Sequence, residues 1–100
     1  MGDRVMVINL LGIDIAKNMF QLHGVDCNGK AVLKKRLSRD ALAEYIANTP
    51  PCTIVMESCG GANYWARVFQ RYGHIVKLIS PQFGIWNYYS NRGSKGQTDL

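Results

Sequence analysis

Two carboxylates in this sequence stand where apolar residues dominate. Asp14 lies within the apolar stretch 5–16, and Glu57 directly follows residues 53–56, a short β-branched run. Because an unpaired carboxylate inside an apolar strand is costly, we expect Asp14 to have a partner or an ion. Divalent cations take oxygen ligands, and a two-metal phosphodiester site needs carboxylates from different elements. The pair therefore predicts a metal site, whereas a carboxylate that caps a turn or pairs with Lys17 is the structural alternative.

Hydropathy patterning predicts the elements that position the two acids. Turn residues at 26–29 join two antiparallel strands, and Pro50 ends the first helix. A right-handed crossover through that helix makes the strands of Asp14 and Glu57 parallel, so we expect both acids to face one cleft. In chain order we expect strands over 5–16, 18–25 and 31–37, a helix capped by Ser38, a strand over 53–56, a helix over 62–72 capped by Gly73, and a strand over 75–79.

This order of elements indicates a fold class. Three strands joined by short turns, followed by helix, strand, helix and strand, are typical of an α/β mixed sheet with helical crossovers. The first three quarters of a ribonuclease H-like fold have this order, and a ferredoxin-like or another α/β sandwich would share part of it. With 100 residues the chain is long enough for one domain and one core.

The charge balance is basic. Twelve Lys and Arg residues against seven Asp and Glu residues give a net charge of +5, which is compatible with a polyanionic partner but does not require one. A cluster within ten residues serves equally as a phosphate-binding patch or as a solvated strand edge protected by lysines. Its members are Lys30, Lys34, Lys35, Arg36 and Arg39.

Cysteines and histidines give no metal-ligand spacing. Cys27, Cys52 and Cys59 are odd in number and lack a CxxC pair, so neither a disulfide framework nor a zinc site is expected. His23 is expected at the surface or in a hydrogen bond, and His74 at a helix end. No stretch approaches the roughly 18 apolar residues of a membrane span, and we expect a cytoplasmic protein without a membrane partner.

Five segments, in this order along the chain, resemble the N-terminal domain of the Piv/MooV-type DEDD insertion-sequence transposases. Any one of them is weakly specific, since Gly-Ile-Asp-Ile also opens sugar kinases and other actin-like ATPases, whereas the ordered set is specific. The segments are GIDIAK at 12–17, FQLHGV at 20–25, MESCG at 56–60, YWAR at 64–67 and ISPQ at 79–82. The resemblance implies a RuvC-like, ribonuclease H-like fold and four acids that bind Mg²⁺ or Mn²⁺ for DNA strand cleavage and exchange.

The resemblance also assigns roles to residues of this chain. Asp14 and Glu57 match the first and second acids, and Asp99 best matches the third, so all three are expected to be catalytic metal ligands. The fourth acid would stand at position 102, after Leu100. Expected nucleic-acid contacts are Lys17, Arg92 and Lys95.

Partners follow from the same resemblance. DNA is the expected substrate, a structured guide RNA accompanies the better-understood members, and the full-length protein is expected to be a homo-oligomer at the bacterial nucleoid. We expect residues 1–100 to be a single RuvC-like catalytic domain, truncated at its carboxyl end and inactive alone. Two other functions stay open: an actin-like or sugar-kinase-like ATPase fragment, with Asp14 near nucleotide phosphates, and a non-catalytic nucleic-acid-binding remnant.

Overall fold

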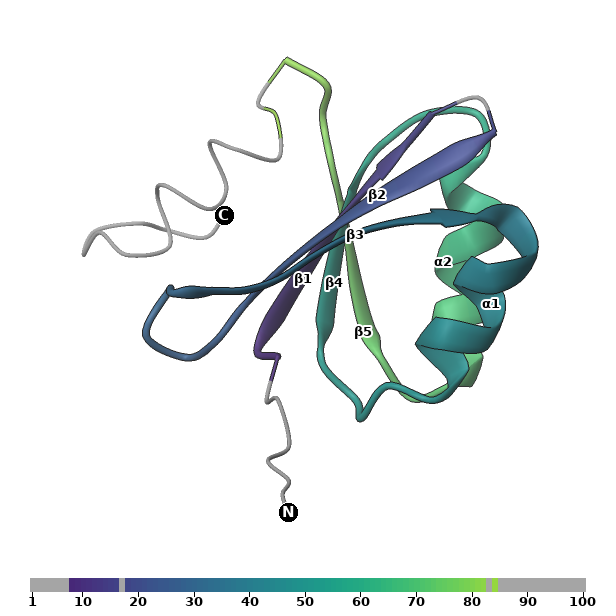
Figure 1. Cartoon of the computed structure of the whole chain (residues 1–100). Coiled ribbons are helices and arrows are strands. Elements are labelled where there is room, and N and C mark those ends of the chain that lie inside the picture. The colour runs from purple at the N-terminus through teal and green to yellow at the C-terminus, as the bar shows by residue number, and fades with distance from the viewer. Residues whose placement is uncertain (1–7, 17, 83, 85–100) are drawn as a thin grey trace.

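A five-stranded mixed sheet carries both helices on one of its faces (Figure 1). The computed structural model describes residues 8–16, 18–82 and 84. The strand order across the sheet is β3-β2-β1-β4-β5. The elements are β1 (Leu10–Ile15), β2 (Met19–Val25), β3 (Ala31–Ser38), α1 (Arg39–Ala47), β4 (Thr53–Glu57), α2 (Ala62–Arg71) and β5 (Ile75–Ile79).

The strand directions explain why the helices share a face. β1, β2 and β3 pair antiparallel in sequence, whereas β4 lies parallel to β1, and β5 parallel to β4. The crossovers through α1 and α2 both carry the chain toward the β5 edge, so their usual right-handedness puts both helices on the same side. The predicted mixed α/β sheet, with three antiparallel N-terminal strands and two helical crossovers, is confirmed.

Local signals set most element boundaries. The amide of Ala41 donates to Ser38 Oγ at 3.3 Å, which confirms the predicted N-cap of α1. Gly73 has a φ of 94°, the left-handed conformation expected just after α2. The differences from the prediction lie at element ends. Within the described ranges, β1 begins at Leu10 and ends at Ile15, although a strand was expected over 5–16. β2 begins one residue later than expected, β3 and β4 each run one residue longer, and α2 ends one residue earlier.

The core lies mainly between the sheet and the helices. Successive side chains of a strand point to opposite faces, so Leu11 and Ile13 of β1 pack toward α1 and α2. Leu10 points to the other face, where it is buried against Val55 of β4. We call this second face, on which no described helix lies, the helix-free face. The helix-side cluster comprises Leu11, Ile13, Phe20, Leu22, Leu42, Ile46, Ile54, Met56, Trp65, Ala66 and Phe69.

His74 follows the end of α2, as expected, and it is buried, which the sequence did not indicate. It is 4% exposed, and its Nδ1 accepts from the amide of Cys52 at 3.1 Å. Because Nδ1 acts as an acceptor, Nε2 carries the proton and donates to the carbonyl of Ile46 at 3.1 Å. The ring therefore joins the end of α1 to the start of β4 and β5. No helix within the described ranges is long and apolar enough to cross a membrane.

Candidate metal and nucleic-acid site

Asp14 and Glu57 stand side by side at the ends of the two central parallel strands. The β1–β4 register runs from Leu10↔Thr53 to Ile13↔Met56, and each acid is the next residue of its strand. Because Ile13 and Met56 both face the helices, alternation places both acids on the helix-free face. Neighbouring strands are about 4.8 Å apart, so the two carboxylates belong to one local site.

The chain reverses or turns away directly after each acid. The amide of Ala16 donates to the Met19 carbonyl at 3.0 Å, which closes the turn from β1 into β2. The amide of Ser58 donates to the Ile79 carbonyl at 2.7 Å, which ties the end of β4 to β5. Both acids are thus held at strand ends that are anchored by backbone hydrogen bonds, at the carboxyl edge where parallel sheets commonly place functional groups.

Solvent reaches both carboxylates. Asp14 is exposed and Glu57 is partly buried, so the expectation of a buried Asp14 that needs a compensating partner is wrong. The apolar run suggested burial on both faces, but alternation gives the buried positions to Leu11 and Ile13, while Asp14 stands near the strand end on the helix-free face. A solvated carboxylate needs no partner to remain charged, and it is available to a cation.

Gly84 brings a later part of the chain to the second acid. A Cβ built on Gly84 would lie 3.9 Å from Glu57 Oε2, and the Gly84 amide donates to the Ser80 carbonyl at 3.1 Å. The segment after β5 therefore turns back toward the acid pair. Sequence patterning did not single out Gly84. The structure gives it a φ of 83°, a conformation that favours glycine, so its residue type was the only signal that the sequence offered.

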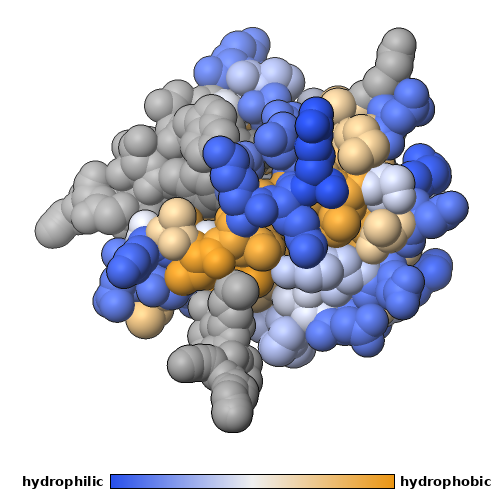
Figure 2. Space-filling view, viewed as in Figure 1, coloured by the Kyte–Doolittle hydropathy of each residue, from blue (hydrophilic) through white to orange (hydrophobic). Residues whose placement is uncertain are grey.

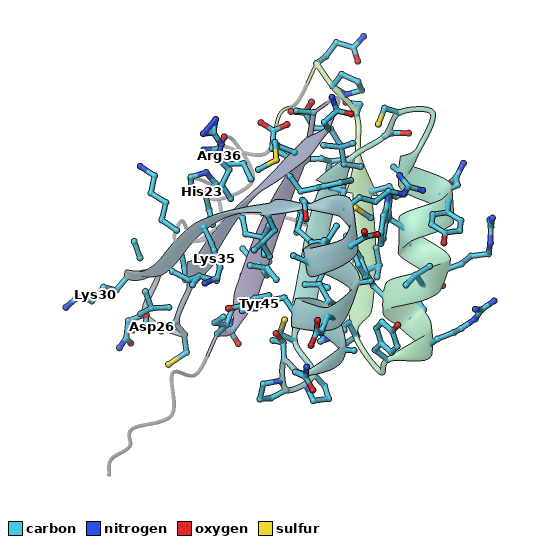
Figure 3. The ribbon with its side chains drawn as sticks, turned by 45° about the vertical axis from the view of Figure 1, so that its right-hand side comes forward. His23, Asp26, Lys30, Lys35, Arg36 and Tyr45 are labelled. Atoms are coloured by element: carbon cyan, nitrogen blue, oxygen red, sulfur yellow. The ribbon has the colours of Figure 1, made fainter. Side chains whose placement is uncertain are left out.

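Polar residues extend the site across the sheet toward β3. Asp14 pairs in register with Gln21 of β2, and Gln21 pairs with Arg36 of β3. One row along, His23 pairs with Lys34. Directly opposite residues share a face, so all five lie on the helix-free face. Figure 3 shows His23 and Arg36 on the side of the sheet away from Tyr45 of α1.

The electrostatics of His23 reflect this arrangement. Partial burial lowers its pKa from the ordinary value of 6.5, the charge of Lys34 lowers it further, and the charge of Asp14 opposes both effects. An imidazole at this position is therefore biased toward the neutral form near neutral pH. The two charges that act on it are the cation of β3 and the acid of β1, one on either side.

Four cations of the basic cluster divide between the two sides of the sheet. Lys35 Nζ lies 5.3 Å from the centre of the Tyr45 ring, on the helix side. Arg39 Cζ lies 5.2 Å from the Trp65 ring and 5.9 Å from the Tyr64 ring. These two cations cover aromatic residues of the helical layer, whereas Lys34 and Arg36 share a face with the acids.

The remaining expected site residues fall outside the described ranges. Within those ranges, no group of three or more His, Cys, Asp and Glu side chains could hold a metal ion. The structure thus brings together the first two expected acids, and the others stay predictions. The expected residues outside the described ranges are Lys17, Arg92, Lys95 and Asp99.

Comparison with known proteins found transposases. The chain is 49% identical over 76 residues to the transposase for insertion sequence element IS1328 of Yersinia enterocolitica, which is 76% of this chain and 23% of that protein. It is 44% identical over 78 residues to a probable family 20 transposase of Pseudomonas aeruginosa, or 78% of this chain and 23% of that protein.

A third relative carries the same kind of name. The transposase for insertion sequence element IS1111A of Coxiella burnetii is 45% identical over 75 residues, which is 75% of this chain and 21% of that protein. The chain therefore spans less than a quarter of the length of these curated relatives. No family model matches it. The expected similarity to insertion-sequence transposases is confirmed.

Proposed function

We propose that this chain is the metal-binding catalytic part of a DNA transposase of the DEDD type, which cleaves and exchanges strands of insertion-sequence DNA. The observation that carries the proposal is the placement of Asp14 and Glu57, adjacent at the carboxyl ends of β1 and β4 on one face. The names of the relatives, all transposases, support it independently. A structured guide RNA and a homo-oligomer of the whole protein belong to the same proposal.

The proposed fold is ribonuclease H-like, of the RuvC-like kind. Support comes from the strand order β3-β2-β1-β4-β5, with an antiparallel first half and parallel β4 and β5. It also comes from the single helical layer, since both helices cover the same face (Figure 1). This arrangement leaves the strand ends that carry the acids uncovered by described helices.

The donor chemistry of the acid pair fits Mg²⁺ or Mn²⁺. Mg²⁺ is commonly bound through one or two carboxylates together with water and substrate phosphates. Asp14 is exposed and Glu57 partly buried, so both can give oxygen atoms to a cation that also contacts substrate. Asp99 is the proposed third ligand. When bound, the metal would neutralise charge on the scissile phosphate and activate the attacking hydroxyl or water.

A paramagnetic titration tests this site without requiring turnover. Substoichiometric Mn²⁺ should broaden the amide resonances around Asp14 and Glu57 first in a ¹H–¹⁵N spectrum of the purified protein. The broadening should disappear in an Asp14→Asn/Glu57→Gln variant. Asp40→Asn, which removes an exposed carboxylate from the first turn of α1, is the matched control and should retain it. Broadening that survives in the double variant would place the cation elsewhere and exclude the acid pair as its site.

A further inference from the structure

We propose that Lys34 and Arg36 of β3 form a phosphate-binding track for a nucleic-acid strand that crosses the helix-free face toward the acid pair. The direction of the track rests on the proposed function, because the acids mark where the scissile phosphate lies. Its ligand is the phosphodiester backbone, which DNA and RNA share. None of the nucleic-acid contacts expected from the sequence, Lys17, Arg92 and Lys95, belongs to this strand.

The strand register aligns Arg36 with the first acid, Asp14. Arg36 pairs with Gln21, and Gln21 pairs with Asp14, so the three residues form one row across β3, β2 and β1. Two strand spacings separate the backbone of Arg36 from that of Asp14, or roughly 10 Å. A strand bound at the acids can therefore reach Arg36 within a few nucleotides.

Gln21 keeps the cation and the acid apart. Its side chain is exposed and uncharged and stands between Arg36 and Asp14 in the row. A basic residue at this position would be attracted to Asp14, and an acidic one would hold Arg36 in an ion pair. With an amide there, the guanidinium stays available for a phosphate, which it can bind with two parallel hydrogen bonds.

Lys34 adds a second charge one row along the same strand. It pairs in register with His23, which in turn pairs with Gly12 of β1. Lys34 and Arg36 are two residues apart in an extended strand and so point to the same side, about 6–7 Å apart along it. Both side chains are exposed. Figure 2 shows hydrophilic side chains gathered across the middle of one view of the molecule, with hydrophobic residues on either side.

Two neighbouring cations, Lys35 and Arg39, differ from Lys34 and Arg36 because they contact aromatic rings. Lys35 and Arg39 are engaged with the rings of Tyr45, Tyr64 and Trp65. Within the described ranges, no ion pair or ring contact engages Lys34 or Arg36. Protection of the β3 edge against pairing with another chain needs charge on the strand but favours neither face. A structural role therefore accounts for Lys35 and Arg39 and leaves the other two available to a ligand.

The experiment is a binding titration in EDTA, so that the acid pair and any metal do not contribute. Fluorescence anisotropy follows a labelled 20-nucleotide single-stranded DNA, and in a second arm the RNA of the same sequence, at several salt concentrations. The Lys34→Gln/Arg36→Gln variant should bind more weakly in at least one arm. A plot of the logarithm of the association constant against the logarithm of the salt concentration has a negative slope. Its magnitude should decrease by about 1.4 in this variant, because each of the two lost phosphate contacts accounts for about 0.7.

Two further variants make the result decisive. Arg67→Gln/Arg71→Gln removes the same charge from exposed positions of α2 on the helix side, and Lys34→Arg/Arg36→Lys keeps the charge on β3. The first should change the slope little, and the second should retain binding. Loss confined to one arm assigns the track to that nucleic acid. An unchanged slope for the glutamine variant of β3, or an equal loss in the α2 variant, would overturn the proposal.

The outcome is independent of the metal site. Asp14→Asn/Glu57→Gln removes negative charge beside the track, so this variant should bind the nucleic acid more tightly in EDTA. If the track fails while Mn²⁺ broadening around the acids persists, the proposed function stands and only the path of the strand is wrong. If the broadening fails while the track holds, the chain binds nucleic acid through β3 without the proposed metal chemistry.

Discussion

The imidazole of His74 holds the carbonyl of Ile46 at 3.1 Å, across 28 residues of chain. The same ring accepts from the amide of Cys52 at 3.1 Å. Through these two bonds the last turn of α1 is fixed against the approach to β4, the strand that ends in Glu57. A side chain remote from the acids thus anchors the end of β4 opposite to Glu57.

Replacing His74 should destabilise the fold. His74→Phe keeps a ring but leaves the Cys52 amide without its acceptor, whereas the Ile46 carbonyl still accepts from the Thr49 amide at 3.1 Å. One unsatisfied buried polar group costs about 1–3 kcal/mol, so the free energy of unfolding should fall by that amount. Urea unfolding measures the change. Gln70→Ala, at an exposed position of α2, should stay within about 0.5 kcal/mol of the parent; equal midpoints for both variants would contradict this role of the His74 ring.

Gly84 should be intolerant of a side chain, and Gly60 tolerant. Gly84 has a φ of 83°, whereas Gly60 has a negative φ and open space around it. A left-handed residue with a Cβ costs about 1–2 kcal/mol, so Gly84→Ala should lower the free energy of unfolding or release the segment from Glu57. Chemical shifts of Glu57 and urea unfolding report the two outcomes. No effect on either quantity would show that the conformation at Gly84 is not required.

The pKa of His23 should respond to both of its charged neighbours. Burial and Lys34 hold it below 6.5, so the folded state takes up its proton less readily than the unfolded chain. This group therefore costs stability as the pH falls below about 6.5, and the loss is complete below the folded pKa. Lys34→Gln should raise the pKa and Asp14→Asn should lower it, as measured by NMR titration of the imidazole. A pKa that is unmoved in both variants would refute the placement of these groups.

The three cysteines should differ in their rates of alkylation. Burial raises the pKa of Cys52 to about 11, whereas Cys27 and Cys59 are exposed. The thiolate is the reactive form, so at pH 8 iodoacetamide should label Cys27 and Cys59 first and Cys52 only upon unfolding. Mass spectrometry of timed digests gives the order. Early labelling of Cys52 would show that the region around His74 opens in the native state.

Under the proposed function, DNA cleavage by the full-length protein should depend on the acid pair. Asp14→Asn or Glu57→Gln should reduce Mg²⁺-dependent cleavage of DNA that carries the ends of its own element by at least roughly 100-fold, which corresponds to several kcal/mol of charge stabilisation. Asp40→Asn is the matched control and should cleave normally.

The ATPase alternative is tested by melting. ATP with Mg²⁺ should leave the Tm unchanged, because a ligand raises stability only when it binds the native state. A nucleotide-dependent rise in Tm that is lost in Asp14→Asn would instead support the alternative, in which Gly12-Ile13-Asp14 approaches nucleotide phosphates.

Much of the fold could be predicted because its signals are local. Ser38 as a cap, Gly73 in a left-handed conformation and the turn at 26–29 each act within a few residues, and together they fix the element order. The Asx turn at Asp26, whose Oδ1 accepts from the amides of Asn28 and Lys30 at 2.9 Å, is of the same kind.

The site was only partly predictable because its remaining features join distant parts of the chain. The pairing of Asp14 with Gln21 and the return of Gly84 to Glu57 depend on strand register and chain path. The exposure of Asp14 was missed because a hydropathy run does not show which positions near a strand end reach solvent. His74 was missed because nothing in its neighbours indicates that its partner lies 28 residues away.

The alternation within Lys34-Lys35-Arg36 also makes the hairpin length a functional constraint. Shortening or lengthening β3 by one residue on its turn side, without a compensating bulge, would exchange the two faces. Lys35 would then face the acids, while Lys34 or Arg36 would meet Tyr45. A substitution in β3 changes one charge on one face, whereas a single-codon insertion or deletion there would change which side chains lie on both faces.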